Sequence, residues 1–208
     1  DGLRIGPLTR HVQIAQAAWP PRLALLGDAA RVIADVQVRN RGTVGGSLAY
    51  ADPAGDWAPP LLALGASVLL RGSSSERSEP LQEFFTGEHE TVVQPGEMIS
   101  EVHAPTVGVA ATGAYVKLAR RHGDYAVASV AVQIDWSKDG RIGRAGIGLG
   151  GVSGTPVKAV AAEAFLQGQA NDRSVIERAR ELVMQTVDPI SDFRGSAEYR
   201  TAMAGELF

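Results

Sequence analysis

The pattern of apolar and polar positions in the first half of the chain predicts short strands alternating with helices. Residues 1–5 have the composition of a short strand. Thr9 is a suitable N-cap for a helix reaching about residue 18, and Pro21 suits the first turn of a second helix that ends near residue 33. Residues 35–60 show no clear period. The other elements predicted here are the end of a buried helix at 61–64, strands at 67–71 and 98–102, a hairpin-like loop at 72–78 and a short helix at 81–85.

The order of predicted elements changes after a run of small residues at 106–112, from alternating strands and helices to strands followed by helices. This run is the predicted domain boundary. Strands are predicted at 114–118, 126–136 and 144–150, and the middle one alternates at Val130, Val132 and Ile134 before a turn. Helices are predicted at 160–166, 174–187 and 196–207. A meander followed by helices predicts an α+β domain with helices packed on one face of a small antiparallel sheet. We therefore expect domains at 1–108 and 109–208.

Composition narrows the classes of function. The 208 residues are 45% hydrophobic and 21% charged, with a formal net charge of -3, so a core is expected and a nucleic-acid footprint is not. The absence of Cys excludes disulfides and iron–sulfur or zinc sites bound through sulfur, so a redox centre on this chain must be an organic cofactor. The four His are scattered, which argues against a metal site. No apolar stretch approaches the roughly 20 residues that span a bilayer, and a soluble cytoplasmic protein is expected.

A glycine-rich loop inside residues 35–60 is the first candidate for chemistry. Its sequence is Thr43-Val44-Gly45-Gly46-Ser47. Adjacent glycines allow close backbone approach to a ligand and can aim successive N–H groups at a phosphate. Asp52 and Asp56 follow and can accept hydrogen bonds from ligand hydroxyls. The alternative is an ordinary glycine turn with a helix cap at Asp56, and Arg39 and Arg41 serve either phosphates or solvent.

Three later segments have distinctive composition. In the loop 117–126, Gly123 and Asp124 turn the chain and present Tyr125, which would either cover a planar ligand or pack against its own domain. Alternating glycines at 145–151 thin a predicted strand, which allows another element to pack closely against it. Residues 195–200 have the polarity of the start of a terminal helix, at the surface or in an interface.

Five ordered segments carry a resemblance to a known family. They are IADVQVRNRGTVGGSLAYADPAGD (33–56), PGEMISEVHAP (95–105), AYVKLARRHGDYAVASVAV (114–132), GIGLGGVSGTP (146–156) and GSAEYR (195–200). Together they resemble the medium, FAD-binding subunit of molybdenum hydroxylases, which include aerobic carbon monoxide dehydrogenase and the xanthine dehydrogenase group. The resemblance extends from near Ile5 to the C-terminus. It implies an FAD-binding domain of the vanillyl-alcohol-oxidase type up to about residue 105, and the family's C-terminal α+β domain after about residue 110.

The resemblance also implies which residues contact FAD. The resemblance implies that the phosphate and ribityl region is lined by Thr43, Gly45, Gly46 and Ser47, and that cofactor hydroxyls are bound by Asp52 and Asp56. It also implies that Ile99 lies beside the isoalloxazine, that Lys117 lies near the polar edge of the flavin, and that Tyr125 covers the flavin ring. Ser47 stands where many members of the family have Asn, which changes one polar contact. No residue is implied to be catalytic toward the organic substrate, and none to bind a metal.

The family's division of labour is part of the same expectation. Substrate would be hydroxylated at a molybdenum cofactor on a large partner subunit, and electrons would pass through [2Fe-2S] clusters of a small partner to FAD and then to an external acceptor. The lack of Cys agrees with this arrangement. The resemblance thus implies an oxidoreductase subunit in a hetero-oligomer.

One difference from the family concerns the start of the chain. Family members begin with a lobe that carries a second glycine-rich loop for the pyrophosphate, and nothing in these 208 residues matches it. The resemblance implies either that the chain is a fragment or that the lobe was lost, with FAD binding weakened by roughly 3–6 kcal/mol. Two alternatives stay open: a stand-alone flavin oxidase, which turnover without partners would support, and an assembly subunit without FAD.

Overall fold

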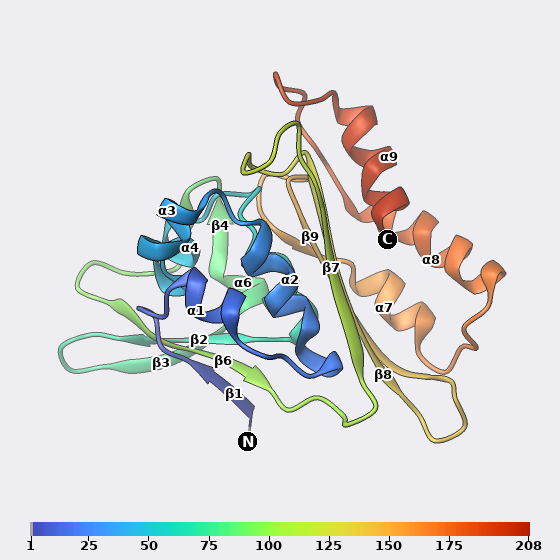
Figure 1. Cartoon of the computed structure of the whole chain (residues 1–208), viewed down its shortest axis with the longest axis horizontal. Helices are drawn as coiled ribbons and strands as arrows, with labels where there is room; N and C mark the ends of the chain where they lie inside the picture. Colours follow the sequence, from blue (N-terminus) through green and yellow to red (C-terminus); the bar gives the residue numbers. More distant parts are fainter. Residues whose placement is uncertain (1) are drawn as a thin grey trace.

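The predicted strands form two four-stranded antiparallel sheets in the computed structural model, which describes residues 2–208 (Figure 1). The first sheet has the order β1–β6–β2–β3. Its strands are β1 (Gly2–Ile5), β6 (Met98–Pro105), β2 (Ser67–Arg71) and β3 (Glu76–Pro80). The loop predicted after β2 is the turn of a hairpin, because β3 pairs with β2 over its full length.

Helices cover this sheet, and two of them lie within residues 35–60, where the sequence showed no clear period. The helices are α1 (His11–Gln16), a 3-10 turn (Pro21–Leu23), α2 (Ala24–Val32), α3 (Val36–Arg41), α4 (Val44–Tyr50), α5 (Ala58–Leu64) and α6 (Leu81–Phe84), followed by the small hairpin β4 (Phe85–Gly87) and β5 (Glu90–Thr91). The predicted helix from Thr9 to residue 18 is shorter than expected. It begins after Arg10, whose backbone N–H donates to the Gln13 side chain.

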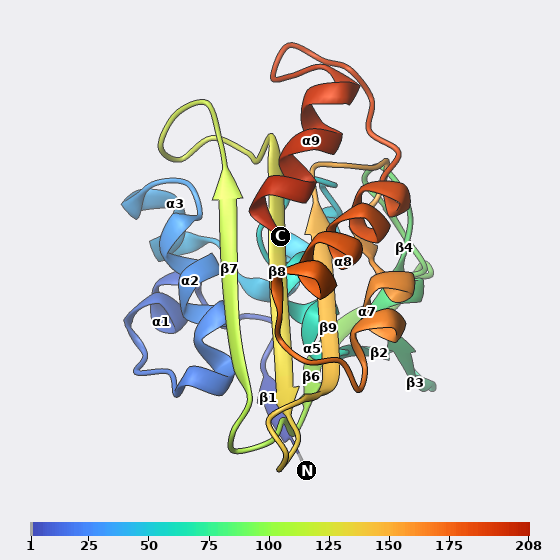
Figure 2. The ribbon, with the colours of Figure 1, turned by 90° about the vertical axis from the view of Figure 1, so that its right-hand side faces the viewer.

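The second sheet has the order β10–β9–β8–β7 and forms the centre of the molecule. Its elements are β7 (Thr112–Leu118), β8 (Ala128–Trp136), β9 (Ile142–Gly150), β10 (Val157–Lys158), α7 (Val160–Leu166), α8 (Arg173–Thr186) and α9 (Ala197–Leu207). Figure 2 shows α7, α8 and α9 on one face, as the sequence predicts. The opposite face is covered by α2 and α5 from the first half of the chain, which the sequence pattern did not indicate.

Glycines in β9 make this second contact possible. A Cβ atom at Gly146 would lie 1.9 Å from the carbonyl oxygen of Ala63, and one at Gly148 would lie 2.0 Å from that of Pro59. Both carbonyls belong to α5. Glycine therefore lets the helix backbone lie directly on the strand. The alternating glycines of residues 145–151 predicted such a close contact.

Two groups of buried side chains form the core. One includes Trp57, Leu25 and Leu61 and lies between the first sheet, the helices α1 to α6 and the inner face of β7. The other includes Ile147 and Leu166 and lies between the second sheet and α7 to α9.

Among residues 2–208, no helix is long and apolar enough to cross a membrane.

Candidate cofactor site

A cavity of about 500 Å³ opens where the two halves of the chain meet. Its walls come from three separate regions: His11 at the start of α1, residues 33–56 around α3 and α4, and the end of β7 with the loop that follows it. The cavity wall combines apolar side chains, hydroxyl groups and charged groups. Such a lining suits an aromatic ligand that also carries polar groups.

The glycine-rich loop is fixed by hydrogen bonds to the N-terminal segment. The backbone N–H of Val44 donates to the Thr9 carbonyl (3.0 Å) and that of Gly45 donates to the Pro7 carbonyl (2.9 Å). A Cβ at Gly45 would lie 2.6 Å from Cβ of Pro7, so only glycine fits against this segment. Gly45 therefore lies behind the cavity wall and does not line it.

The residues around Gly45 do line the cavity. They are Thr43, Gly46 and Ser47. Thr43 is the N-cap of α4, and its hydroxyl accepts a hydrogen bond from the Gly46 N–H (3.2 Å). The first amides of α4 thus have partners within the protein. The loop presents the hydroxyl groups of Thr43 and Ser47 and the Cα atom of Gly46 to the cavity. The sequence had suggested a series of backbone N–H groups without protein partners.

Replacing Thr43 by Ala is expected to lower the free energy of unfolding by about 1 kcal/mol, because it removes the side-chain cap of α4. Urea denaturation followed by circular dichroism measures this change. Thr43→Ser keeps the hydroxyl and is the matched control, so its midpoint should stay near that of the unsubstituted protein. Equal midpoints for the Ala and Ser variants would contradict the capping role.

A buried trio of side chains includes two residues of the cavity lining, Asp56 and Lys117, and one residue behind them, Tyr115. The Tyr115 hydroxyl donates to Oδ1 of Asp56 (2.6 Å), and Nζ of Lys117 donates to Oδ2 (2.9 Å). The Asp56 and Lys117 side chains are only 7% and 5% exposed, respectively. Burial raises the pKa of Asp56 above its ordinary value, while Lys117 and Tyr115 act in the opposite direction. The carboxylate thus fixes the Lys117 ammonium group in the cavity wall.

Tyr115 was not singled out from the sequence. It lies on β7 two positions before Lys117, so both side chains point to the same face of the sheet. That spacing was the available signal. Burial raises the pKa of the Tyr115 phenol well above its ordinary value, so the group stays protonated as a donor to Asp56.

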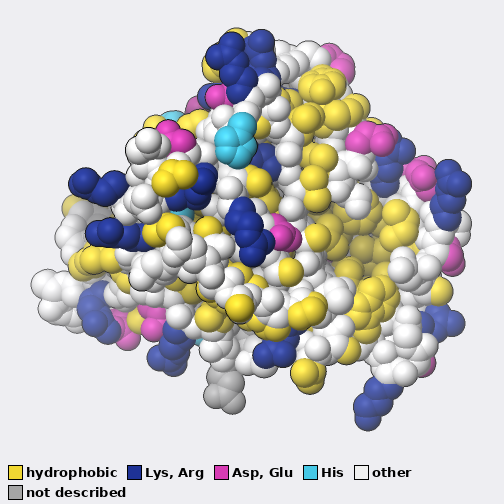
Figure 3. All heavy atoms as spheres, in the orientation of Figure 1, with side chains coloured by type: hydrophobic (Ala, Val, Ile, Leu, Met, Phe, Trp, Pro, Cys, Tyr) yellow, Lys and Arg dark blue, Asp and Glu magenta, His cyan; other side chains and the backbone are white. Residues whose placement is uncertain are grey.

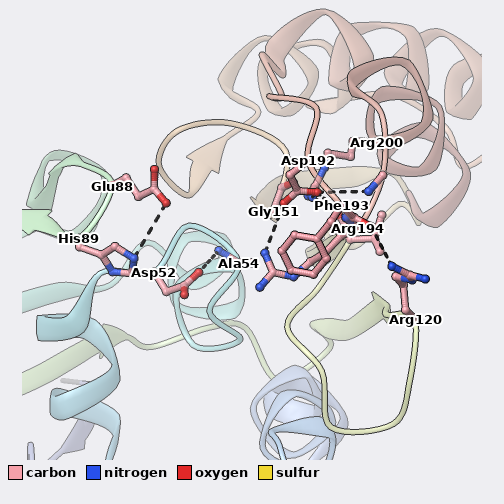
Figure 4. Close-up of polar contacts among 12 residues, drawn as sticks. Asp52, Ala54, Glu88, His89, Arg120, Gly151, Asp192, Phe193, Arg194 and Arg200 are labelled. Atoms are coloured by element: carbon pink, nitrogen blue, oxygen red, sulfur yellow. Dashed lines mark hydrogen bonds and ion pairs between the residues drawn. The ribbon is translucent and has the colours of Figure 1, made fainter.

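Tyr125 lies at the cavity mouth, 42% exposed, on the loop that the sequence indicated. The Arg194 guanidinium carbon lies 5.8 Å from its ring centroid and 4.6 Å from that of Phe193. Arg120 donates to the Phe193 carbonyl (2.8 Å), which links loops far apart in sequence (Figure 4). In Figure 3, Lys and Arg side chains gather at the top of the molecule, at the end where these loops lie.

Besides Gly45, two further predicted residues lie away from the cavity lining. Asp52 accepts a hydrogen bond from the Ala54 N–H (2.9 Å) and shapes the turn after α4 (Figure 4). Ile99 is buried in the first of the two core groups. His11 and Tyr50 line the cavity and were not predicted, while Arg41, one of two arginines considered for phosphates, also lines it. Among residues 2–208, no cluster of three or more His, Asp or Glu could hold a metal ion.

Family models match both halves of the chain. Residues 1–107 match the FAD binding domain in molybdopterin dehydrogenase, and residues 113–208 match the CO dehydrogenase flavoprotein C-terminal domain. The medium chain of carbon monoxide dehydrogenase from Afipia carboxidovorans is 36% identical over 96% of this chain and 69% of its own length. The nicotine 6-hydroxylase medium subunit of Paenarthrobacter nicotinovorans is 37% identical over the whole chain and 72% of its own length.

A solved structure agrees with these matches. Carbon monoxide dehydrogenase from Hydrogenophaga pseudoflava superposes with a TM-score of 0.93 at 36% identity, covering 98% of this chain and 71% of that one. The fold and the cavity define a flavin-binding subunit of an oxidoreductase. The chain belongs to the family of FAD-binding medium subunits of molybdenum hydroxylases.

Proposed function

We propose that this chain is the electron-transfer subunit of a cytoplasmic molybdenum hydroxylase. It takes electrons from the iron–sulfur clusters of a small partner subunit and passes them to an external acceptor, while the organic substrate reacts at the molybdenum cofactor of a large partner. The observation that carries the proposal is the 500 Å³ cavity with the Asp56–Lys117 pair in its wall. Family membership supports the proposal, and so do the names of relatives that are medium subunits.

The lining of the cavity fits FAD. Hydroxyl groups of Thr43 and Ser47 and the bare backbone at Gly46 form one wall, which suits the hydroxyl- and phosphate-bearing part of the cofactor. Lys117 supplies a donor for the polar edge of the flavin, Asp56 supplies an acceptor for cofactor hydroxyls, and Tyr125 supplies an aromatic face. Gly45, Asp52 and Ile99 were also expected to bind FAD. We propose that they support these contacts from behind the wall.

The chemistry of the site comes from the cofactor. Bound FAD accepts and releases electrons, and the protein tunes this through placement and charge. The Lys117 side chain, paired with Asp56, lies in the cavity wall, where an ammonium group favours an electron-rich ligand. Since Asp56 already accepts from two donors and Tyr115 stays protonated, we propose that no residue of this chain acts as general acid or base on the organic substrate.

The proposed function is tested by Tyr125→Ala in the complex with both partners. We expect the rate of flavin release to rise about three- to tenfold, since one aromatic contact contributes roughly 0.5–1.5 kcal/mol. Reduction of the molybdenum centre by substrate should be unchanged. Flavin absorbance after gel filtration and rapid-mixing kinetics measure the two effects.

Tyr199→Ala is the matched control, because Tyr199 is similarly exposed (46%) and lies on α9 outside the cavity lining. It should change neither quantity. The proposal would be wrong if Tyr125→Ala abolished substrate oxidation at molybdenum while the flavin stayed fully bound and reducible. Turnover by the chain without partners would favour a stand-alone oxidase.

A further inference from the structure

His11 is a buried histidine in the cavity wall, and its two ring nitrogens have different surroundings. The residue is 5% exposed and begins α1. Its Nδ1 accepts a hydrogen bond from the indole Nε1–H of Trp57 at 2.9 Å, and Trp57 is itself 1% exposed. Because an indole nitrogen can only donate, Nδ1 must be the nitrogen without a proton.

The other nitrogen, Nε2, therefore carries the proton of the neutral ring. Burial lowers the pKa of His11 to about 4, so the imidazole is neutral near pH 7. Within residues 2–208, Nε2 makes no hydrogen bond. The Nε2 atom is not among the enclosed polar atoms that lack a partner, and His11 is part of the cavity wall, so this N–H donor is accessible from the cavity.

Gly42 leaves the Nε2 edge of the ring uncovered. A Cβ at Gly42 would lie 2.5 Å from Nε2 and 2.8 Å from Cδ2 of His11. Gly42 lines the same cavity, and its carbonyl accepts the backbone N–H of His11 at 3.1 Å. Any larger residue at position 42 would displace the ring or cover this edge.

The charges around the cavity indicate which acceptor suits a neutral donor. The charged residues that line it are Arg41, Asp56, Lys117 and Asp124. Arg41 supplies a cation for the anionic part of a ligand, while Lys117 is already paired with Asp56. A neutral N–H group matches an uncharged acceptor, such as a carbonyl oxygen, a ring nitrogen or a hydroxyl oxygen.

Resting on the proposed function, we propose that His11 is a cofactor-binding residue whose Nε2–H donates a hydrogen bond to an uncharged acceptor atom of the bound flavin. Trp57 is the positioning residue that fixes the tautomer. This contact joins the start of α1 to the cofactor, forty-six positions before Trp57 in the chain.

Two substitutions separate this role from a purely structural one. In His11→Gln the amide N–H₂ reaches the position of Nε2 and keeps a donor in the cavity. In His11→Asn the shorter side chain can accept from Trp57 but presents no donor at the position of Nε2. We expect flavin dissociation constants of the Gln variant within about twofold of the unsubstituted complex, and a three- to tenfold increase for the Asn variant.

The reverse order, with the Asn variant unaffected and the Gln variant weakened, would show that His11 serves Trp57 alone and would overturn the proposal. Equal affinities of all three proteins would overturn it as well. If the unsubstituted complex held no flavin at all, the proposed function itself would fail. Flavin fluorescence during titration measures each constant, and thermal denaturation shows whether each variant is folded.

A measurement on the unsubstituted chain keeps the proposal testable if the variants do not fold. The chain has four His, so ¹⁵N labelling of histidine gives a simple long-range ¹H–¹⁵N spectrum. We expect His11 to show the Nε2–H tautomer before FAD is added, and the Nε2 signal to shift when FAD saturates the site. A proton on Nδ1, or an Nε2 signal that does not move at saturation, would contradict the proposal.

Discussion

Asp56→Ala is expected to lower the free energy of unfolding by about 3–5 kcal/mol and to abolish flavin retention. The substitution leaves the Lys117 ammonium group buried without a counter-charge and the Tyr115 hydroxyl without its acceptor. The penalty for an uncompensated buried charge exceeds the modest net contribution of an intact pair. Chemical denaturation and flavin absorbance measure the two effects.

A double variant separates the two losses at this position. Adding Lys117→Met to Asp56→Ala removes the stranded charge and should restore part of the stability, without restoring flavin binding. Asp56→Asn keeps an acceptor for Tyr115 and should lie between the unsubstituted protein and the Ala variant. If Asp56→Ala kept the stability of the unsubstituted protein, the buried trio would not be the structural support of the site.

Gly146→Ala and Gly148→Ala should each destabilise the protein by about 3 kcal/mol. The added methyl groups would lie 1.9 and 2.0 Å from backbone carbonyl oxygens of α5, and a backbone cannot yield as a flexible side chain does. Relief requires α5 to move away from β9, which weakens the contact between the two halves of the chain.

Urea denaturation measures this loss. Gly154→Ala is the control, because its Cβ would meet no atom within 4 Å and should leave the midpoint nearly unchanged. Midpoints for Gly146→Ala and Gly148→Ala equal to that of the control would contradict the close packing of α5 on β9.

The elements of the second half were predictable because its strands and its longer helices each contain several repeats of the apolar pattern. β7, β8, β9 and the fourteen-residue α8 lie within a few residues of the predicted ranges. The helices α3 and α4 were not predicted. They have six and seven residues, too few for an apolar period to emerge, and their stability comes from caps and from packing.

The site was predictable only in part for a related reason. Local composition drew attention to the loop around Thr43 and to Tyr125, which both line the cavity. The Asp56–Lys117 pair joins residues sixty-one positions apart, and its geometry depends on how the segment before α5 meets the end of β7. His11 likewise depends on Trp57, and no local pattern around residue 11 marks it as part of the wall.

The visible absorption spectrum of the complex, purified with its large and small partner subunits and desalted, shows whether this chain holds flavin. We predict a flavin band at one FAD for each copy of this chain, and the loss of that band in the Asp56→Ala complex with the iron–sulfur absorbance intact. Full iron–sulfur absorbance without any flavin band in the unsubstituted complex would contradict this prediction, and would make this chain an assembly subunit.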